Sequence, residues 1–303
     1  MMIKNNARLF LTISGLIMVA ALLMSLFGAG INFGIDFTGG LNIRYNMNQA
    51  FEQADVEAAL EAQGITVFNI AHSGEAGEYL EIRIPELQGD GEIQTLQQSL
   101  ESTLLEKYPN MDTETATASY VGPIAGAALL RNAIISVLLA NVLMLVYIAF
   151  RFDLNSGMAA VIGLLHDVLI MLSFMVILRN IIQMNSSFIA AMLTIVGYSI
   201  NNTIVIFDRI RENNKLPQYA SNTREEVVSI SIRQSLGRTI FTSLTTLTTI
   251  TVLYIMGVDS IREFSLPIIV GVLSSVYSAN LINGYVWAFL EERRRDRKKA
   301  KLA

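Results

Sequence analysis

Six long apolar runs place the strongest constraint on how this sequence can fold. Each run has about 20 residues or more, which is enough for a helix to cross a hydrocarbon core about 30 Å thick. A water-soluble protein would interrupt such runs with a charged residue every turn or two. We therefore expect a polytopic α-helical membrane protein with six transmembrane helices. The predicted spans are Leu9–Phe27, Asn132–Phe150, Leu154–Leu178, Ser186–Phe207, Thr239–Val258 and Phe264–Leu290.

Basic residues lie at both ends of the chain. Lys4 and Arg8 precede the first span, and residues 291–303 form a basic tail. Basic flanks mark the cytoplasmic side, and six spans return the chain to the side on which it began, so we expect both termini in the cytoplasm. The first run is long for the apolar part of a cleaved signal peptide, so we interpret residues 1–29 as a tail and an uncleaved span. Beside a span, the basic tail favours lipid headgroups over nucleic acid, with a ribosome or translocon contact as the alternative.

Residues 30–122 have a different composition, with fifteen acidic and three basic residues. This is typical of a soluble domain, so we expect an external domain between the first and second spans. The chain has no cysteine, which excludes disulfides and thiolate metal sites there. Alternating and helical apolar patterns follow one another in the order β-α-β-β-α-β, which predicts an α+β ferredoxin-like unit. The expected strands are Leu41–Met47, Ile65–Ile70, Glu78–Ile84 and Thr113–Val121, the expected helices are Phe51–Gln63 and Glu92–Tyr108, and a turn is expected at residues 73–77.

A glycine-rich segment, Phe33–Gly40, joins the first span to this domain. Its sequence is FGIDFTGG, and it includes Asp36, Gly39 and Gly40. The glycine pair permits a bend where the chain leaves the bilayer, so we interpret the segment as a structural hinge. A phosphate-binding loop is excluded because no Lys-Ser/Thr pair follows.

The stretch Thr194–Asn213 carries a polar cluster inside an apolar run. At helical spacing Thr194, Tyr198, Asn201, Asn202, Val205 and Asp208 are expected on one side of the fourth span. A membrane helix with one polar side faces a partner helix or a wet path rather than lipid. After it we expect a mixed-charge cytoplasmic loop at residues 208–238, with a short amphipathic helix near 224–236, inside a five-helix bundle at 123–290.

This stretch, together with Phe33–Gly40 and Leu165–Val168, resembles the SecF proteins of the SecD/SecF family, relatives of the resistance–nodulation–division transporters. The polar run ends in DRIREN, with Asp208 and Arg209. The resemblance covers most of the chain. It implies an accessory subunit of the Sec translocase in the bacterial cytoplasmic membrane, with SecD as obligate partner, the SecYEG channel and exported polypeptides as clients, and no cofactor. It also implies that the proton-motive force promotes late steps of export.

His166 and Asp167 form the deepest ionisable pair predicted in the membrane. Counting about 1.5 Å per residue from Asp153 places them near the midplane, about 10 Å deeper than Asn202. Burial and mutual contact suit such a pair to proton relay. A neutral, hydrogen-bonded structural pair is the alternative, and the chemistry leaves both open.

Position 202 departs from the family pattern. Most members carry Asp there and this chain has Asn202, whereas the Arg that the family associates with proton passage is present as Arg238. A neutral amide binds water but cannot take up a proton near neutral pH. Either Asn202 orients water for a relay through Asp167, or this subunit is a passive partner and the titrating acid belongs to SecD. From the sequence we favour the passive interpretation.

Two other functions compete. A related proton-coupled exporter of small molecules or lipids would carry twelve spans and larger external domains, which favours the translocase subunit. An intramembrane hydrolase using Ser199 and His166 lacks a G-x-S-x-G run, so we expect no enzyme.

Overall fold

The computed structural model describes residues 2–73, 78–85, 90–180, 182–257 and 259–302, which form two compact units. The membrane unit consists of residues 1–32 and 134–303, and the α/β unit of Phe33–Ala133. The helix α5 (Pro123–Arg151) belongs to both units, because the division falls within it. Each unit is described by itself below.

The α/β unit is built around a four-stranded antiparallel sheet. The strand order is β2-β3-β1-β4, and Ile43 of β1 lies between Ile82 of β3 and Ala118 of β4. The order β1-α3-β2-β3-α4-β4 is the one that the sequence predicts. The bounds are β1 Gly40–Asn46, α3 Gln53–Ala62, β2 Asn69–Ser73, β3 Tyr79–Ile84, α4 Asp90–Lys107 and β4 Asp112–Val121, preceded by the short helix α2, Ile35–Thr38.

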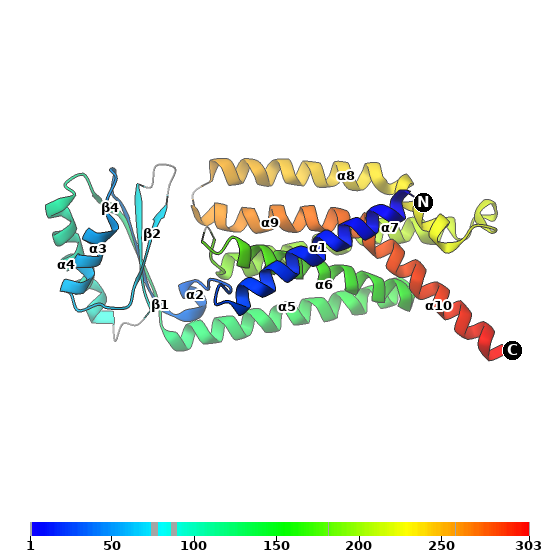
Figure 1. The fold of residues 1–303 in the computed structure, drawn as a ribbon, viewed down its shortest axis with the longest axis horizontal. Helices are drawn as coiled ribbons and strands as arrows, with labels where there is room; N and C mark the ends of the chain where they lie inside the picture. Colours follow the sequence, from blue (N-terminus) through cyan, green and yellow to red (C-terminus); the bar gives the residue numbers. More distant parts are fainter. Residues whose placement is uncertain (1, 74–77, 86–89, 181, 258, 303) are drawn as a thin grey trace. The chain divides into compact units, whose positions relative to one another are not determined.

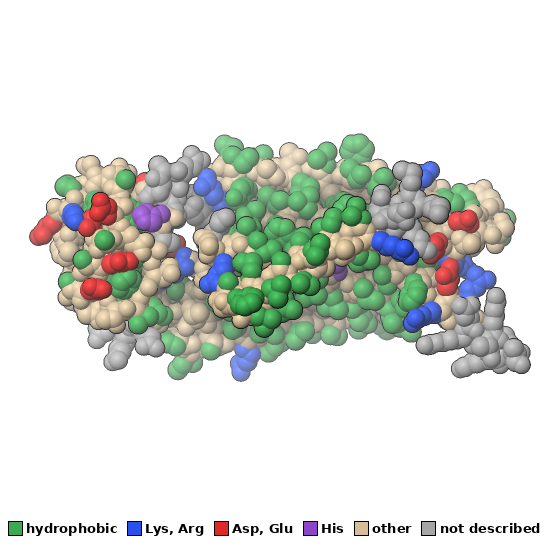
Figure 2. Space-filling view, in the orientation of Figure 1, with side chains coloured by type: hydrophobic (Ala, Val, Ile, Leu, Met, Phe, Trp, Pro, Cys, Tyr) green, Lys and Arg blue, Asp and Glu red, His purple; other side chains and the backbone are tan. Residues whose placement is uncertain are grey.

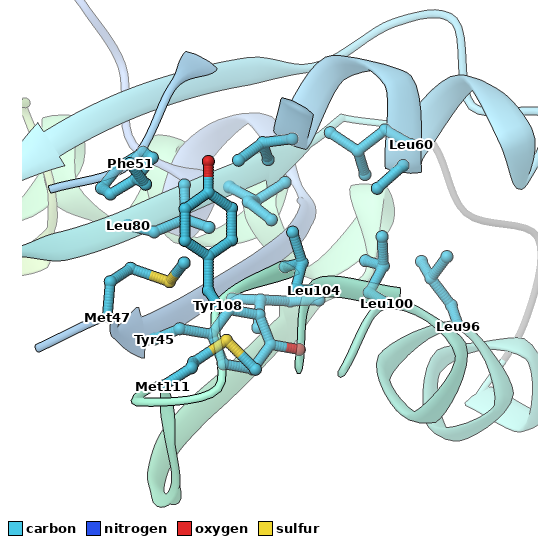
Figure 3. Packing of buried hydrophobic residues seen from close by; sticks show 14 of the residues in the cluster. Tyr45, Met47, Phe51, Leu60, Leu80, Leu96, Leu100, Leu104, Tyr108 and Met111 are labelled. Atoms are coloured by element: carbon cyan, nitrogen blue, oxygen red, sulfur yellow. The ribbon is translucent and has the colours of Figure 1, made fainter. Parts of the chain in front are cut away.

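Apolar residues from the strands and from both helices form one core in this unit. Figure 3 shows Tyr45 of β1, and Met47 just after it, in one packed cluster with Leu60 of α3 and Leu100 of α4. The alternation of β1 places Leu41, Ile43 and Tyr45 on this side, and Met47 continues the pattern just after the strand; all four are fully buried. The core explains why the unit adopts two layers.

One predicted strand of the α/β unit is displaced. The strand predicted at Ile65–Ile70 is observed at Asn69–Ser73, because Ile65 and Phe68 pack against the core from a connecting segment after the helix. The apolar residues at 65–68 therefore belong to a loop that packs on the core, and the strand begins after them at Asn69. The turn predicted at 73–77 falls largely on residues 74–77, outside the described residues.

In the membrane unit, the described residues contain six helices long and apolar enough to cross a membrane (Figure 1). The helix α9 contacts α6, α7 and α8, and α1 packs against α6. A π-helical segment at Ser278–Asn283 joins α9 to α10, so the sixth span is continuous from one to the other. The bounds are α1 Met2–Leu26, α5 Pro123–Arg151, α6 Leu154–Ile177, α7 Ser186–Asn213, α8 Arg224–Met256, α9 Asp259–Tyr277 and α10 Gly284–Leu302.

The segment predicted as a loop at residues 208–238 is helical at both of its ends. The helix α7 continues to Asn213, and α8 begins at Arg224 and runs into the fifth span. Thr223 and Glu226 form a capping box that starts α8, and no proline interrupts it afterwards. The expected short amphipathic helix is thus the first part of α8. The basic tail is likewise helical up to Leu302.

Apolar side chains gather on the face of the membrane unit that Figure 2 shows. Most residues in the apolar spans of α1, α5 and α8 are exposed in this single chain. In the apolar parts of α6, α7 and the sixth span, about half of the residues or more are buried. The α6, α7 and sixth-span helices therefore form the interior in which polar groups must find partners.

Candidate functional site

The carboxylate of Asp167 is the centre of a polar cluster inside the membrane unit. The residue is fully buried. Its Oδ2 accepts hydrogen bonds from the hydroxyls of Ser199 (2.6 Å) and Ser278 (2.9 Å), and its Oδ1 accepts one from Ser274 (2.7 Å). Three different elements, α7, α9 and the π-helix, therefore turn a hydroxyl toward one acid of α6. Such saturation is what a charge-bearing group needs in a water-poor interior.

His166 extends the cluster in the opposite direction. Its Nδ1 lies 3.1 Å from Asp167 Oδ1, and its Nε2 lies 3.3 Å from the hydroxyl of Tyr277. The Tyr277 hydroxyl lies 2.9 Å from Ser14 Oγ of α1. The pair that the sequence predicts is thus in contact, and a hydrogen-bonded chain connects it to the first span.

Local helix geometry explains why the cluster forms. Ser274 and Ser278 are four residues apart, so they lie on one side of the sixth span and reach the same carboxylate. The π-helix begins at Ser278, and such insertions re-aim side chains and often occur at functional sites. Further along it, Asn283 donates to Thr203 (2.8 Å) and occupies the space that a Cβ at Gly163 would need, 1.9 Å from its Oδ1.

Asn202 is buried next to this cluster but does not belong to its hydrogen bonds. Its Nδ2 donates to Ser275 Oγ at 3.0 Å. Ser199, which donates to Asp167, lies three residues before Asn202 on α7. Along the helix axis, Asn202 therefore lies about 4.5 Å from the residue that contacts Asp167. The estimate of about 10 Å from the sequence is larger because it counted along two different helices, from Asp153 and from Asp208.

The predicted polar side of α7 divides into two. Asn202 is buried, whereas Thr194 and Asn201 are exposed in the single chain and Tyr198 is half-buried. The Tyr198 hydroxyl donates to Ser243 of α8 at 2.9 Å, which ties the two helices together. The prediction placed these residues on one side because the 3.6-residue period alone does not locate the neighbouring helices.

Arg238 lies on an exposed side of α8. Together with Thr242, Thr245 and Thr249 it recurs at intervals of three or four residues, which places all four on one stripe of the helix. The threonine hydroxyls donate to carbonyls of their own helix. As far as the described residues go, the Asp167 cluster does not include Arg238.

The residues of the two sequence motifs have structural partners. Asp208 pairs with Arg151 at 3.3 Å, and Arg209 binds Gln234 at 2.7 Å, so both tie α7 to neighbouring elements at one end of the spans. Gly39 and Gly40 have φ angles of 76° and 119°, and a Cβ at Gly40 would lie 2.6 Å from the Ile84 carbonyl. These glycines are needed because a side chain would clash with backbone. Asp36 lies in the first turn of α2.

Sequence reasoning did not find Ser14 or Tyr277. Serines such as Ser274 and Ser278 are common where membrane helices pack closely, so their spacing alone did not point to a shared contact with Asp167. The signal for Ser14 was a lone serine in an apolar run, which is too common to interpret without knowing which helix it faces. The contact with Tyr277 joins residues 263 positions apart in the chain.

The geometry does not fit a serine hydrolase. A nucleophile and its base must be hydrogen-bonded to each other. Instead, Ser199 donates to Asp167, and His166 contacts Asp167 and Tyr277. In the described part of the chain, no group of three or more His, Asp or Glu residues gathers as a metal site.

Comparison with known proteins places this arrangement in a family. The profile described as "Protein export membrane protein SecD/SecF, C-terminal" matches residues 101–293, and the one described as "SecD/SecF GG Motif" matches residues 25–50. The chain belongs to the SecD/SecF family. The glycine pair described above lies within the second match, and the Asp167 cluster within the first, apart from Ser14.

Individual relatives agree. Protein translocase subunit SecF of Endomicrobium trichonymphae is 36% identical over 90% of this chain and 86% of the relative, and that of Calditerrivibrio nitroreducens is 33% identical over 96% and 94%. Among solved structures, the crystal structure of SecDF from Thermus thermophilus, described as a translocon-associated membrane protein, matches with a TM-score of 0.79 and 33% identity. The match covers 95% of this chain and 38% of the SecDF chain. The SecF relatives are named as translocase subunits, and the six apolar helices make this SecD/SecF member a multi-pass cell membrane protein.

Proposed function

We propose that the chain is an accessory subunit of the Sec protein translocase that works with a SecD partner and uses the proton-motive force to promote late steps of protein export. The family membership supports the translocase role. The SecDF chain is much longer than this one, which supports a partner that supplies the remainder. In this proposal both termini are cytoplasmic, and residues 30–122 form a ferredoxin-like domain outside the membrane.

The observation that carries the proton role is the buried pair of Asp167 and His166. Both side chains can bind and release a proton, and they are in contact at 3.1 Å. A structural carboxylate in lipid is expensive, whereas an acid with a histidine partner and three hydroxyl donors has the composition of a relay. The contacts support the relay interpretation over the passive one that the sequence favours, because the cluster around Asp167 is complete without an acid at position 202.

Asn202 and Arg238 then have separate tasks. Asn202 packs one turn from the cluster, and its amide can bind water that enters from that side. Arg238 lies on the exposed stripe of α8 instead. Polar residues rarely face lipid, so this stripe and the exposed Asn201 are the surface that we assign to the SecD partner.

An export assay driven by an imposed proton gradient tests the proposal. The full complex in proteoliposomes is compared as parent, Asp167→Asn, Asn202→Asp and Glu212→Gln. We expect Asp167→Asn to abolish the gradient-stimulated part of export while the complex still co-purifies. Asn202→Asp is expected to keep it, and Glu212→Gln serves as the matched control because this acid is exposed. Retained stimulation in an assembled Asp167→Asn complex would reject the relay and restore the passive interpretation.

A further inference from the structure

Ser14 is the one buried polar residue among those of α1 whose side chains are described. Only 2% of it is exposed, although most of the surrounding helix faces outward. A hydroxyl buried at membrane depth requires a hydrogen-bond partner, and here the partner is Tyr277 at 2.9 Å. The first span is therefore tied to the sixth by a specific polar contact in addition to apolar packing.

The ring of Tyr277 is held on two sides. Phe10, one turn before Ser14 on α1, stacks on it with centroids 5.5 Å apart and an interplanar angle of 24°. His166 meets it edge to face, with centroids 5.4 Å apart and an angle of 89°. These contacts keep the Tyr277 hydroxyl between Ser14 Oγ and His166 Nε2.

The result is an unbroken chain of four side chains from α1 to the buried carboxylate. It runs from Ser14 through Tyr277 and His166 to Asp167, with separations of 2.9, 3.3 and 3.1 Å. Among the described residues, the titratable side chains in contact with His166 are Asp167 and Tyr277. The other groups at the cluster are neutral: Phe10 and Ser14 of α1, Ser199 of α7, Ser274 of α9 and Ser278 of the π-helix.

The hydrogen bonds of this chain have two possible directions. When His166 is neutral and donates from Nδ1 to Asp167, its Nε2 accepts from the Tyr277 hydroxyl, which in turn accepts from Ser14. When His166 takes up a proton, Nε2–H donates to Tyr277 and the tyrosine hydroxyl donates to Ser14. The Ser14 hydroxyl then turns to a carbonyl of its own helix, as serines in helices do.

We propose that Tyr277 and Ser14 are positioning residues for the His166–Asp167 pair. They hold the neutral ring in the tautomer with the proton on Nδ1, and they link proton uptake at His166 to the hydrogen bond that holds α1. This span leads directly into the α/β unit along the chain. The inference rests on the proposed proton role of the pair.

Nitrogen NMR of the full-length chain in nanodiscs, labelled with ¹⁵N-histidine, tests the proposal. The sequence has two histidines. His72 is exposed in the α/β unit, so it serves as an internal reference, and His72→Gln assigns the signals. At alkaline pH we expect Nδ1 of His166 to carry the proton and Nε2 to show the shift of a nitrogen that accepts a hydrogen bond.

Three variants distinguish the chain from simple packing. Tyr277→Phe should move the Nε2 resonance downfield, because the donor is lost. Ser14→Ala should move it in the same direction by less, although Ser14 does not contact the ring, because a Tyr277 hydroxyl that has lost the hydrogen bond from Ser14 is a weaker donor. Ser14→Thr, which keeps the hydroxyl, should restore the parent shift. Tyr285→Phe is the matched control, since this tyrosine packs against the apolar cluster of the bundle.

Two results would overturn the proposal. One is a proton on Nε2 in the parent at alkaline pH. The other is an Nε2 resonance that Ser14→Ala leaves unchanged while Ser14→Thr and the parent fold normally. The measurement needs neither a gradient nor export, so its outcome is separate from that of Asp167→Asn. An intact hydrogen-bonded chain without gradient-stimulated export would reject the proposed function alone.

Discussion

Both units of this chain bury apolar side chains, but they differ in the polar residues that they bury. Among the described residues, all buried polar residues belong to the membrane unit, and twenty of them are buried there, including Asp167, Asn202 and Ser14. In the α/β unit the buried side chains are apolar or aromatic, as in the cluster around Tyr45 and Leu100. The same chain therefore uses two different ways of holding its helices together.

The difference follows from the solvent that each unit requires. In water, burying apolar area stabilises a fold by about 25 cal/mol per Å². In lipid the tails are as apolar as leucine, so helices associate through close packing and hydrogen bonds between them. Polar side chains in the membrane unit thus contribute to helix packing, and in the proposed function two of them, His166 and Asp167, also carry protons. In the α/β unit, none of the described polar or charged residues is fully buried.

The largest expected effect is an all-or-none difference in labelling. If the α/β unit lies outside the membrane, Glu61→Cys should react with an impermeant thiol reagent in intact cells and Ser221→Cys should not. Both positions are exposed, so accessibility on the protein is matched. The chain has no cysteine of its own to obscure the signal. The reverse labelling would invert the topology.

Next in size is the loss of an apolar contact in the α/β unit. We expect a soluble fragment Gly40–Val121 to fold alone, and Leu100→Ala to lower its free energy of unfolding by about 2–5 kcal/mol, because a fully buried leucine leaves a cavity. Leu105→Ala on the same helix is the control, since Leu105 is 36% exposed and should change stability by about 0.5 kcal/mol or less. Urea denaturation followed by circular dichroism measures both. A fragment without helix and sheet signals would mean that the core needs the rest of the chain.

A smaller effect is expected for a buried hydrogen bond in the membrane unit. Asn202→Ala removes the contact with Ser275 and should destabilise the bundle by about 0.6 kcal/mol, the average for such bonds between membrane helices. Thr248→Ala is the control, because the Thr248 hydroxyl donates to the carbonyl of Leu244 in its own helix. Unfolding in mixed micelles gives both values. If Asn202→Ala lowered the free energy of unfolding as much as Leu100→Ala does, the expectation that single hydrogen bonds in the membrane unit contribute less than apolar contacts in the α/β unit would be wrong.

The smallest expected effect concerns pH at the surface of the α/β unit. Hydrogen bonds from Lys107 and then from Tyr108 hold the pKa of Asp55 below its ordinary value of 3.8. A lowered folded-state pKa means that the stabilisation is present above pH 3.8 and is lost as the pH falls through the folded-state value. Asp55→Asn should therefore flatten the acid side of the stability curve, while Glu61→Gln, at an exposed position, should leave it steep. If stability falls equally steeply with acid in Asp55→Asn and in the parent, the hydrogen bonds to Asp55 do not cause this pH dependence.

Part of the site was predictable from particular residues. His166 and Asp167 stand out because ionisable groups are rare in apolar runs, and Asn202 because it departs from a motif. The sequence did not predict that Ser14 and Tyr277 join the cluster, or that Arg238 is exposed. Helical spacing shows which residues share one side of a helix, but not which helix packs against that side. For the same reason Asn201 and Asn202 were placed on one side, although one is exposed and the other buried.

The sequence by itself determined the six spans, the order of elements in the α/β unit and the family. These features depend on local hydrophobicity, on periods of two and 3.6 residues, and on contiguous motifs. The tertiary structure alone decided that three serines from three elements meet at Asp167, and that α1 joins the cluster through Ser14. Such contacts join residues up to 263 positions apart. They arise from helix packing, which many sequences with the same apolar pattern would arrange differently.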